Sequence, residues 1–141
     1  MRKKDTDNLH LDLMSSTDLS KFLENNEENF ISESITEILN RVFSEQEISK
    51  AALAKRSGMS EIYLHQIFAG RRTPSRNRLL CLCYGLGVSF EKTQELLREC
   101  GCAQLYPKVR RDAIIIYGLL HQCDLFEIND QLFDENEETL C

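Results

Sequence analysis

The stretch that most constrains this chain runs from Lys50 to Ala69 and reads KAALAKRSGMSEIYLHQIFA. Its apolar and small residues fall where two short helices must face each other to cross closely. A residue without bulk in the first helix lets the second approach it. The inward positions on this reading are Leu53, Ala54, Met59, Leu64 and Ile67.

Three further residues mark where these helices begin and end. Ser49 and Ser60 are good N-caps, because a serine hydroxyl accepts a hydrogen bond from an otherwise unpaired amide of the first turn. Gly58 can adopt the left-handed conformation that ends the first helix without a Cβ penalty. The pattern predicts a helix-turn-helix, whose second helix leaves four outward residues free to read a DNA groove, namely Glu61, Ile62, His65 and Gln66.

The longer run LAKRSGMSEIYLHQIFAGRRTPSRNRLLCLCYGLGVSFEKTQELL resembles the Cro/C1-type (XRE-like) helix-turn-helix domain of phage and bacterial repressors. It combines, in the expected order, an LAxxSG turn, a QIFxGxRxPSR connection and an LxxLxxGLGVSxE ending. The resemblance covers about residues 31–100. It implies a compact five-helix, lambda-repressor-like DNA-binding domain that usually works as a dimer.

Charge is distributed unevenly along the chain. The net charge of −6 would argue against a nucleic-acid partner, but residues 1–48 carry −6, residues 49–111 carry +8 and residues 112–141 carry −8. Because the local field decides whether a polyanion can dock, the basic centre is compatible with DNA. This centre coincides with the helix-turn-helix.

Basic residues cluster around the motif, and we expect them to contact phosphates and set the salt dependence of binding. A merely solvated face is the alternative for such a run of arginines. Tyr63 is equally suited to bracing its helix. The predicted phosphate-binding residues are Lys50, Ser60, Tyr63, Arg71, Arg72, Arg76 and Arg78.

The outward residues of the second helix suggest individual base contacts. Glu61 can accept from a cytosine amino group, Ile62 can touch a thymine methyl, and Gln66 can pair with adenine. His65 can contact a base or a phosphate. A carboxylate near phosphates weakens binding, so the alternative is that Glu61 and Ile62 face a protein partner.

The chain as a whole is predicted to be all-α, in three parts. Residues 1–29 form an N-terminal arm with a helix from Asp18 to Asn25, capped by Thr17, that packs on the main domain or mediates dimerisation. Residues 30–100 form the DNA-binding domain, and residues 101–141 a helical extension with an acidic tail. The first sixteen residues are polar with scattered apolar side chains and are expected to fray at their start.

Within the main domain, apolar spacing predicts a helix from about Phe30 to Gln46. Ser75 and Ser89 are expected to cap the next two helices, and Gly85 and Gly87 to stop the first of these. In the extension, Arg110 to Cys123 favours a helix over a buried strand, because no other strand is visible to pair with it. Asp124 followed by Glu127 is typical of a capping box.

No other chemistry is indicated. Cys81 and Cys83 point in different directions on a helix, and no C-x-x-C pair is present, so a zinc site is disfavoured and a thiol redox sensor is a minor alternative. His121, Cys123 and Asp124 are neighbours at a helix junction, where side chains rarely converge. We therefore expect no enzyme activity, no metal and no cofactor.

These patterns predict a transcriptional regulator that binds double-stranded DNA, and the resemblance implies that it does so as a homodimer. The chain shows no secretory signal and no apolar run long enough to span a membrane, which predicts a cytoplasmic protein. The rival function is a protein-binding adaptor or antitoxin-like partner on the same scaffold. A regulatory protein partner is compatible with either. The acidic C-terminal segment could also bind back on the basic centre and hold DNA off.

Overall fold

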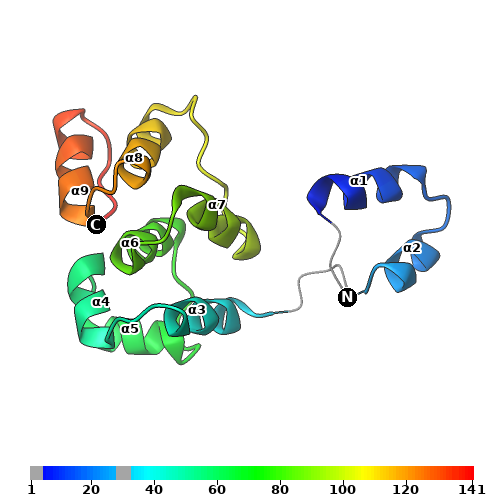
Figure 1. Cartoon of the computed structure of the whole chain (residues 1–141), viewed down its shortest axis with the longest axis horizontal. Helices are drawn as coiled ribbons and strands as arrows, with labels where there is room; N and C mark the ends of the chain where they lie inside the picture. The colour runs from blue at the N-terminus through cyan, green and yellow to red at the C-terminus, as the bar shows by residue number, and fades with distance from the viewer. Residues whose placement is uncertain (1–4, 28–32) are drawn as a thin grey trace. The chain divides into compact units, whose positions relative to one another are not determined.

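The computed structural model describes residues 5–27 and 33–141, and all regular secondary structure in these ranges is helical (Figure 1). The predicted all-α class is confirmed. The helices are α1 (Thr6–Ser15), α2 (Leu19–Asn25), α3 (Ile35–Ser44), α4 (Lys50–Ser57), α5 (Glu61–Phe68), α6 (Arg76–Leu86), α7 (Phe90–Glu99), α8 (Arg110–Leu120) and α9 (Leu125–Asp134). They fall into two compact units, Met1–Ser32 and Glu33–Cys141.

The first unit contains α1 and α2. Residues 6–15 form α1, a helix that the sequence did not predict, with the Asp5 side chain accepting from the Asn8 amide at 2.8 Å. The fraying expected at the start of the chain falls on residues 1–4, which lie outside the described ranges. Helix α2 is confirmed, but Asp18 rather than Thr17 caps it. Of its apolar face Phe22 is buried, whereas Leu19 and Leu23 are exposed. Packing on the main domain and dimerisation both stay predictions.

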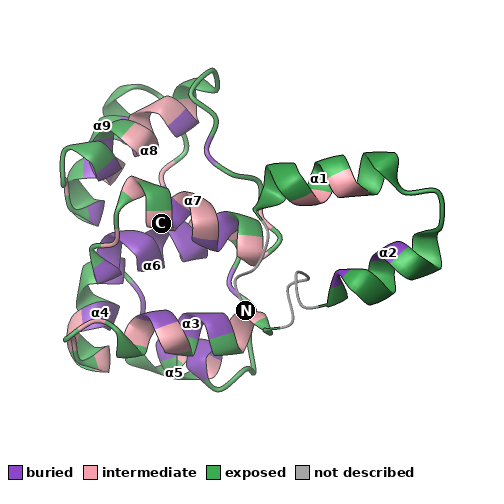
Figure 2. Ribbon diagram, turned by 45° about the vertical axis from the view of Figure 1, so that its right-hand side comes forward, coloured by how far each residue is buried: buried purple, intermediate pink, exposed green. Residues whose placement is uncertain are grey.

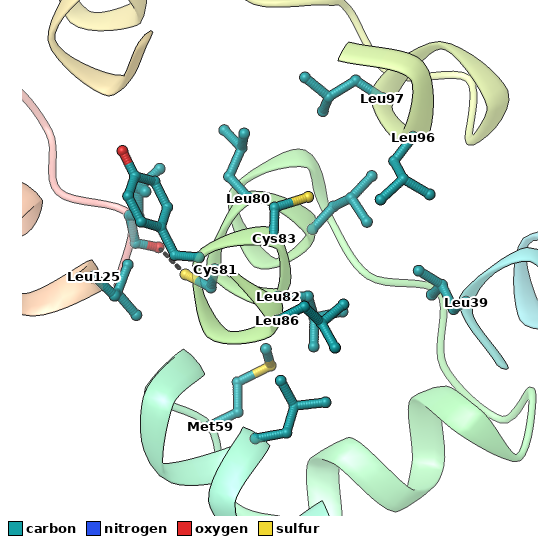
Figure 3. Close-up of a cluster of buried hydrophobic side chains, with 14 of the residues drawn as sticks. Leu39, Met59, Leu80, Cys81, Leu82, Cys83, Leu86, Leu96, Leu97 and Leu125 are labelled. Carbon is teal, nitrogen blue, oxygen red and sulfur yellow. Dashed lines mark hydrogen bonds between the residues drawn. The ribbon is translucent and has the colours of Figure 1, made fainter. Parts of the chain in front are cut away.

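Helix α6 is the centre of the second unit. Every residue from Leu79 to Leu86 is buried, as the purple ribbon of Figure 2 shows. A helix that is buried all round must be enclosed by the other helices. Figure 3 shows side chains from α3, α7 and α9, and from the turn after α4, converging on it: Leu39, Met59, Leu96, Leu97 and Leu125.

The predicted caps of the helix-turn-helix and of the two following helices are confirmed. The hydroxyls of Ser49, Ser60, Ser75 and Ser89 each accept from an amide in the first turn of the helix that follows. Gly58 ends α4 with φ of +67°, the left-handed conformation. Because each cap is a local interaction, the limits of these helices follow from a few neighbouring residues.

The prediction that Gly85 stops a helix is wrong, since α6 continues to Leu86 and ends at Gly87. Gly85 is buried where α4 crosses α6. A Cβ built on it would lie 2.9 Å from the Ser57 Cβ and 3.0 Å from a Leu53 methyl. Position 85 therefore holds a glycine because α4 and α6 pack too closely there for a larger side chain. The helix expected from Phe30 begins at Ile35, capped by Ser34, and ends at Ser44; residues 30–32 lie outside the described ranges.

The C-terminal extension shares the core of the helix-turn-helix. The helix predicted from Arg110 to Cys123 is confirmed as α8, although it ends at Leu120. Ile115 in it is buried, and its carbonyl accepts from the Tyr84 hydroxyl at 2.7 Å. Of the predicted capping box, the structure has the bond in which the Asp124 carboxylate accepts from the Glu127 amide, at 2.8 Å. Leu125, Ile128 and Leu132 of α9 complete the same core.

We predict that Gly85→Ala lowers the free energy of unfolding. Alanine adds about 1 kcal/mol of helix propensity, but overpacking a tight core costs about 1–3 kcal/mol. A net loss of up to about 2 kcal/mol should appear in urea unfolding followed by circular dichroism.

The matched control is the same change in a Ser57→Gly background, where the nearest Cβ is gone. The loss caused by Gly85→Ala should then shrink. Equal or higher stability of the single variant would contradict the close contact between α4 and α6.

Candidate nucleic-acid interface

Helix α5 is held by contacts at both of its ends. At its start the Ser60 hydroxyl accepts from the Tyr63 amide at 3.1 Å. At its end the Asn40 side chain of α3 donates to the Phe68 carbonyl at 3.0 Å, satisfying a carbonyl that lacks a partner within the helix. Leu64 and Ile67 are buried against the core. The helix therefore has a fixed inward side and a defined outward side.

The outward side of α5 forms a shallow hollow of about 370 Å³. Its lining is Ile62, His65, Gln66, Ala69 and Arg71. Three of the four predicted base-reading residues thus come together, while Glu61 is exposed in the first turn. A carboxylate in the first turn interacts favourably with the helix dipole. Sequence reasoning missed Ala69, although the spacing 62, 65, 66, 69 is that of one helix face.

Two arginines flank the aromatic ring of Tyr63. The guanidinium carbons of Arg72 and Arg78 lie 5.3 and 5.4 Å from the ring centroid, within the range of cation–π attraction. Arg72 Nε also donates to Gln66 Oε1 at 2.5 Å. Tyr63 therefore braces the basic cluster, and Arg72 orients a side chain predicted to read a base.

The other predicted phosphate-binding residues lie in different settings. Lys50 begins α4, and its ammonium lies 5.9 Å from the centroid of the Phe68 ring. Arg71 is exposed directly after α5, and its amide donates to the Gln66 carbonyl at 2.9 Å. The contact with Phe68 thus brings the Lys50 ammonium to the last turn of α5, which Arg71 follows in the chain.

Arg76 has internal partners. It donates to the Asp112 carboxylate of α8 at 3.1 Å and to the carbonyls of Ala103 and Gln104 at 2.8 and 3.3 Å. Asp112, which is buried, also accepts from the Tyr106 amide at 3.0 Å. The Arg76 side chain fastens the extension to α6. Its predicted contact with phosphate would have to compete with these bonds.

The acidic tail does fold back, but onto other basic residues. Arg110 binds the Glu135 and Glu137 carboxylates, and Arg111 donates to the carbonyls of Glu138 and Thr139 at 2.8 and 3.3 Å. Beyond them Leu140 is buried. The tail leaves Ile62 and His65 exposed, so in this conformation it does not cover the hollow on α5.

The cysteines of α6 are core residues. Burial raises the pKa of the Cys81 thiol to about 12 and that of Cys83 to about 12, which disfavours the reactive thiolate. Across residues 5–27 and 33–141, no group of three or more His, Cys, Asp or Glu side chains is placed to hold a metal ion. Nor does any helix in those ranges have the length and apolar character needed to cross a bilayer.

Comparison with known proteins identifies one feature. Residues 44–96 match a family model described as a helix-turn-helix domain, which spans α4 to most of α7. No curated protein and no solved structure matches the chain. The chain carries a helix-turn-helix domain, and its Cro/C1-type kinship stays a prediction.

We predict that the Arg76–Asp112 pair stabilises the fold. Arg76→Ala leaves a buried carboxylate with one partner fewer, and breaking such a pair costs about 1–3 kcal/mol where one member is partly exposed. A double-mutant cycle of Arg76→Ala with Asp112→Asn, measured by urea unfolding, should give a coupling energy of about 1 kcal/mol or more. Additive effects would show that the pair does not contribute.

Proposed function

We propose that the protein is a transcriptional regulator that binds double-stranded DNA through α5. The proposal is supported above all by the exposed hollow of Ile62, His65, Gln66 and Ala69, which lies on the second helix of a helix-turn-helix domain and is bordered by Arg71. In helix-turn-helix proteins this helix enters the major groove.

Base edges would be read from the centre of this face. Gln66 can make two hydrogen bonds to adenine, and Ile62 can contact a thymine methyl. His65 lies beside both, and Glu61, at the start of the helix, can accept from a cytosine amino group. Arg72 already donates to the Gln66 amide oxygen. Rotation of Arg72 toward a phosphate would therefore change the orientation of the Gln66 side chain.

Phosphates would be bound around this face. Lys50, Arg71, Arg72 and Arg78 supply positive charge, and Ser60 and Tyr63 supply hydroxyls near the start of α5. Such contacts position a protein on the duplex and dominate its affinity. Arg76 is the weakest member of the predicted set, since its donors already bind Asp112 and two carbonyls.

The variants Arg71→Ala and Gln66→Ala should separate the two roles. Losing a phosphate contact should weaken binding to all sequences alike and reduce the slope of log K against log salt by about 0.9. Losing a base contact should cost about 1–3 kcal/mol of discrimination at one base pair. Fluorescence anisotropy with DNA from the promoter of its own gene, and with scrambled DNA, measures both.

Arg98→Ala is the matched control, because it removes one exposed positive charge from α7 instead. It should leave affinity and salt slope unchanged. If all three variants bound DNA as the parent does, α5 would not be the DNA-binding helix.

A homodimer is part of this proposal, since one α5 can read only a few base pairs. Two copies related by a two-fold axis would place their α5 helices about 34 Å apart, one turn of DNA. Hydroxyl-radical footprinting should therefore show two protected patches about 10 base pairs apart on a near-palindromic site. One patch, with a monomer in sedimentation of the complex, would exclude this arrangement.

The second candidate function is a protein-binding adaptor. It is favoured by Ile62, which is 74% exposed on the face predicted to meet DNA. A thymine methyl would cover only part of this side chain, whereas an apolar pocket of a partner would cover all of it. Ile62→Ser should change base preference if α5 reads DNA, and should leave DNA affinity untouched if it binds a partner.

A further inference from the structure

The outer side of α9 carries two exposed phenylalanines. Phe126 is 56% exposed and Phe133 is 74% exposed. They are seven residues apart, which is two turns of an α-helix, so they lie along one stripe. The apolar positions that face the core are others, Leu125, Ile128 and Leu132. Packing within the second unit, residues 33–141, therefore does not explain the two phenyl rings.

The charge around these rings has one sign. Asp130 is exposed between them along the helix, and Glu127 and Asp134 are exposed nearby. The sequence has no Lys or Arg from residue 112 to residue 141. The nearest arginines in sequence, Arg110 and Arg111, are engaged with the tail. The stripe is apolar at two points and acidic around them.

We propose that this face of α9 docks a protein partner whose surface is an apolar groove bordered by Lys and Arg. An amphipathic helix with apolar anchors two turns apart is the form in which helices bind grooves. The complement of Asp130, Asp134 and Glu127 is a set of basic side chains at the edge of that groove, and arginine is enriched at such interfaces.

A second copy of this chain fits the face poorly. A two-fold contact brings the same patch of both copies together, so the three carboxylates of each α9 would face their equivalents. Like charges at an interface cost free energy and select against the wrong partner. DNA is disfavoured on the same ground. The proposed partner is therefore a different, basic protein surface, and it leaves α5 free.

The test uses the full chain and a fluorescent designed helical-hairpin peptide, whose two helices form a leucine-lined groove with lysines along its edges. Anisotropy should show binding that weakens with salt. Phe126→Ser with Phe133→Ser should weaken it about tenfold or more, as loss of apolar anchors does. Asp130→Asn with Asp134→Asn should weaken it and lower its salt dependence.

Leu120→Ser is the matched control: it removes an apolar side chain that is 58% exposed on α8 rather than α9, and should have no effect. A peptide with glutamate in place of lysine should not bind. Failure of the lysine peptide to bind, or equal binding by the phenylalanine variant, overturns the proposal. So does self-association in sedimentation that the phenylalanine variant abolishes. DNA binding by the variants reports on α5 separately.

Discussion

The packing of α4 against α6 is the contact on which the second unit depends. Ser57 is buried in it, and its hydroxyl donates to the Leu53 carbonyl at 2.6 Å, so the polar group is satisfied within its own helix. Gly85 opposite has no side chain, and the two helices approach until only a glycine fits. Because α5 follows α4 through a single tight turn, this contact also sets the direction in which α5 presents its outer face.

Interactions between near neighbours could be predicted from the sequence, and those between distant residues could not. The serine caps and the left-handed Gly58 each depend on four or five residues, and the inward positions of α4 and α5 then define the outward face of the candidate site. The prediction that Gly85 ends a helix failed because the residue it packs against, Ser57, lies 28 residues away in the sequence. The internal role of Arg76 could not be predicted either, because its carboxylate partner, Asp112, lies 36 residues further along the chain.

The arginines in the basic centre of the chain do not all have the same role. Arg76, Arg110 and Arg111 hold the extension and its acidic tail, and the charges of Arg76 and Arg110 are compensated by carboxylates within the molecule. Arg71 is exposed, Arg72 contacts Gln66 and the Tyr63 ring, and Arg78 contacts the same ring. The net charge of residues 49–111 therefore overstates the charge available to a polyanion. Part of what remains is Arg71, Arg72 and Arg78, which follow α5 in the chain.

The extension also bears on the turn between α4 and α5. A Cβ on Gly58 would lie 3.4 Å from a Leu125 methyl and 3.2 Å from the Cys141 sulfur, so the turn is covered by the start of α9 and by the tail. The tail is held there by the Asn129 side chain, which accepts from the Leu140 amide at 2.8 Å, and by the Cys81 thiol, which donates to the Leu140 carbonyl. Met59 fills the inner side of the same turn. With both sides occupied, the angle between α4 and α5 is fixed by residues from both ends of the unit, and the outer face of α5 is left as the part that a partner can reach.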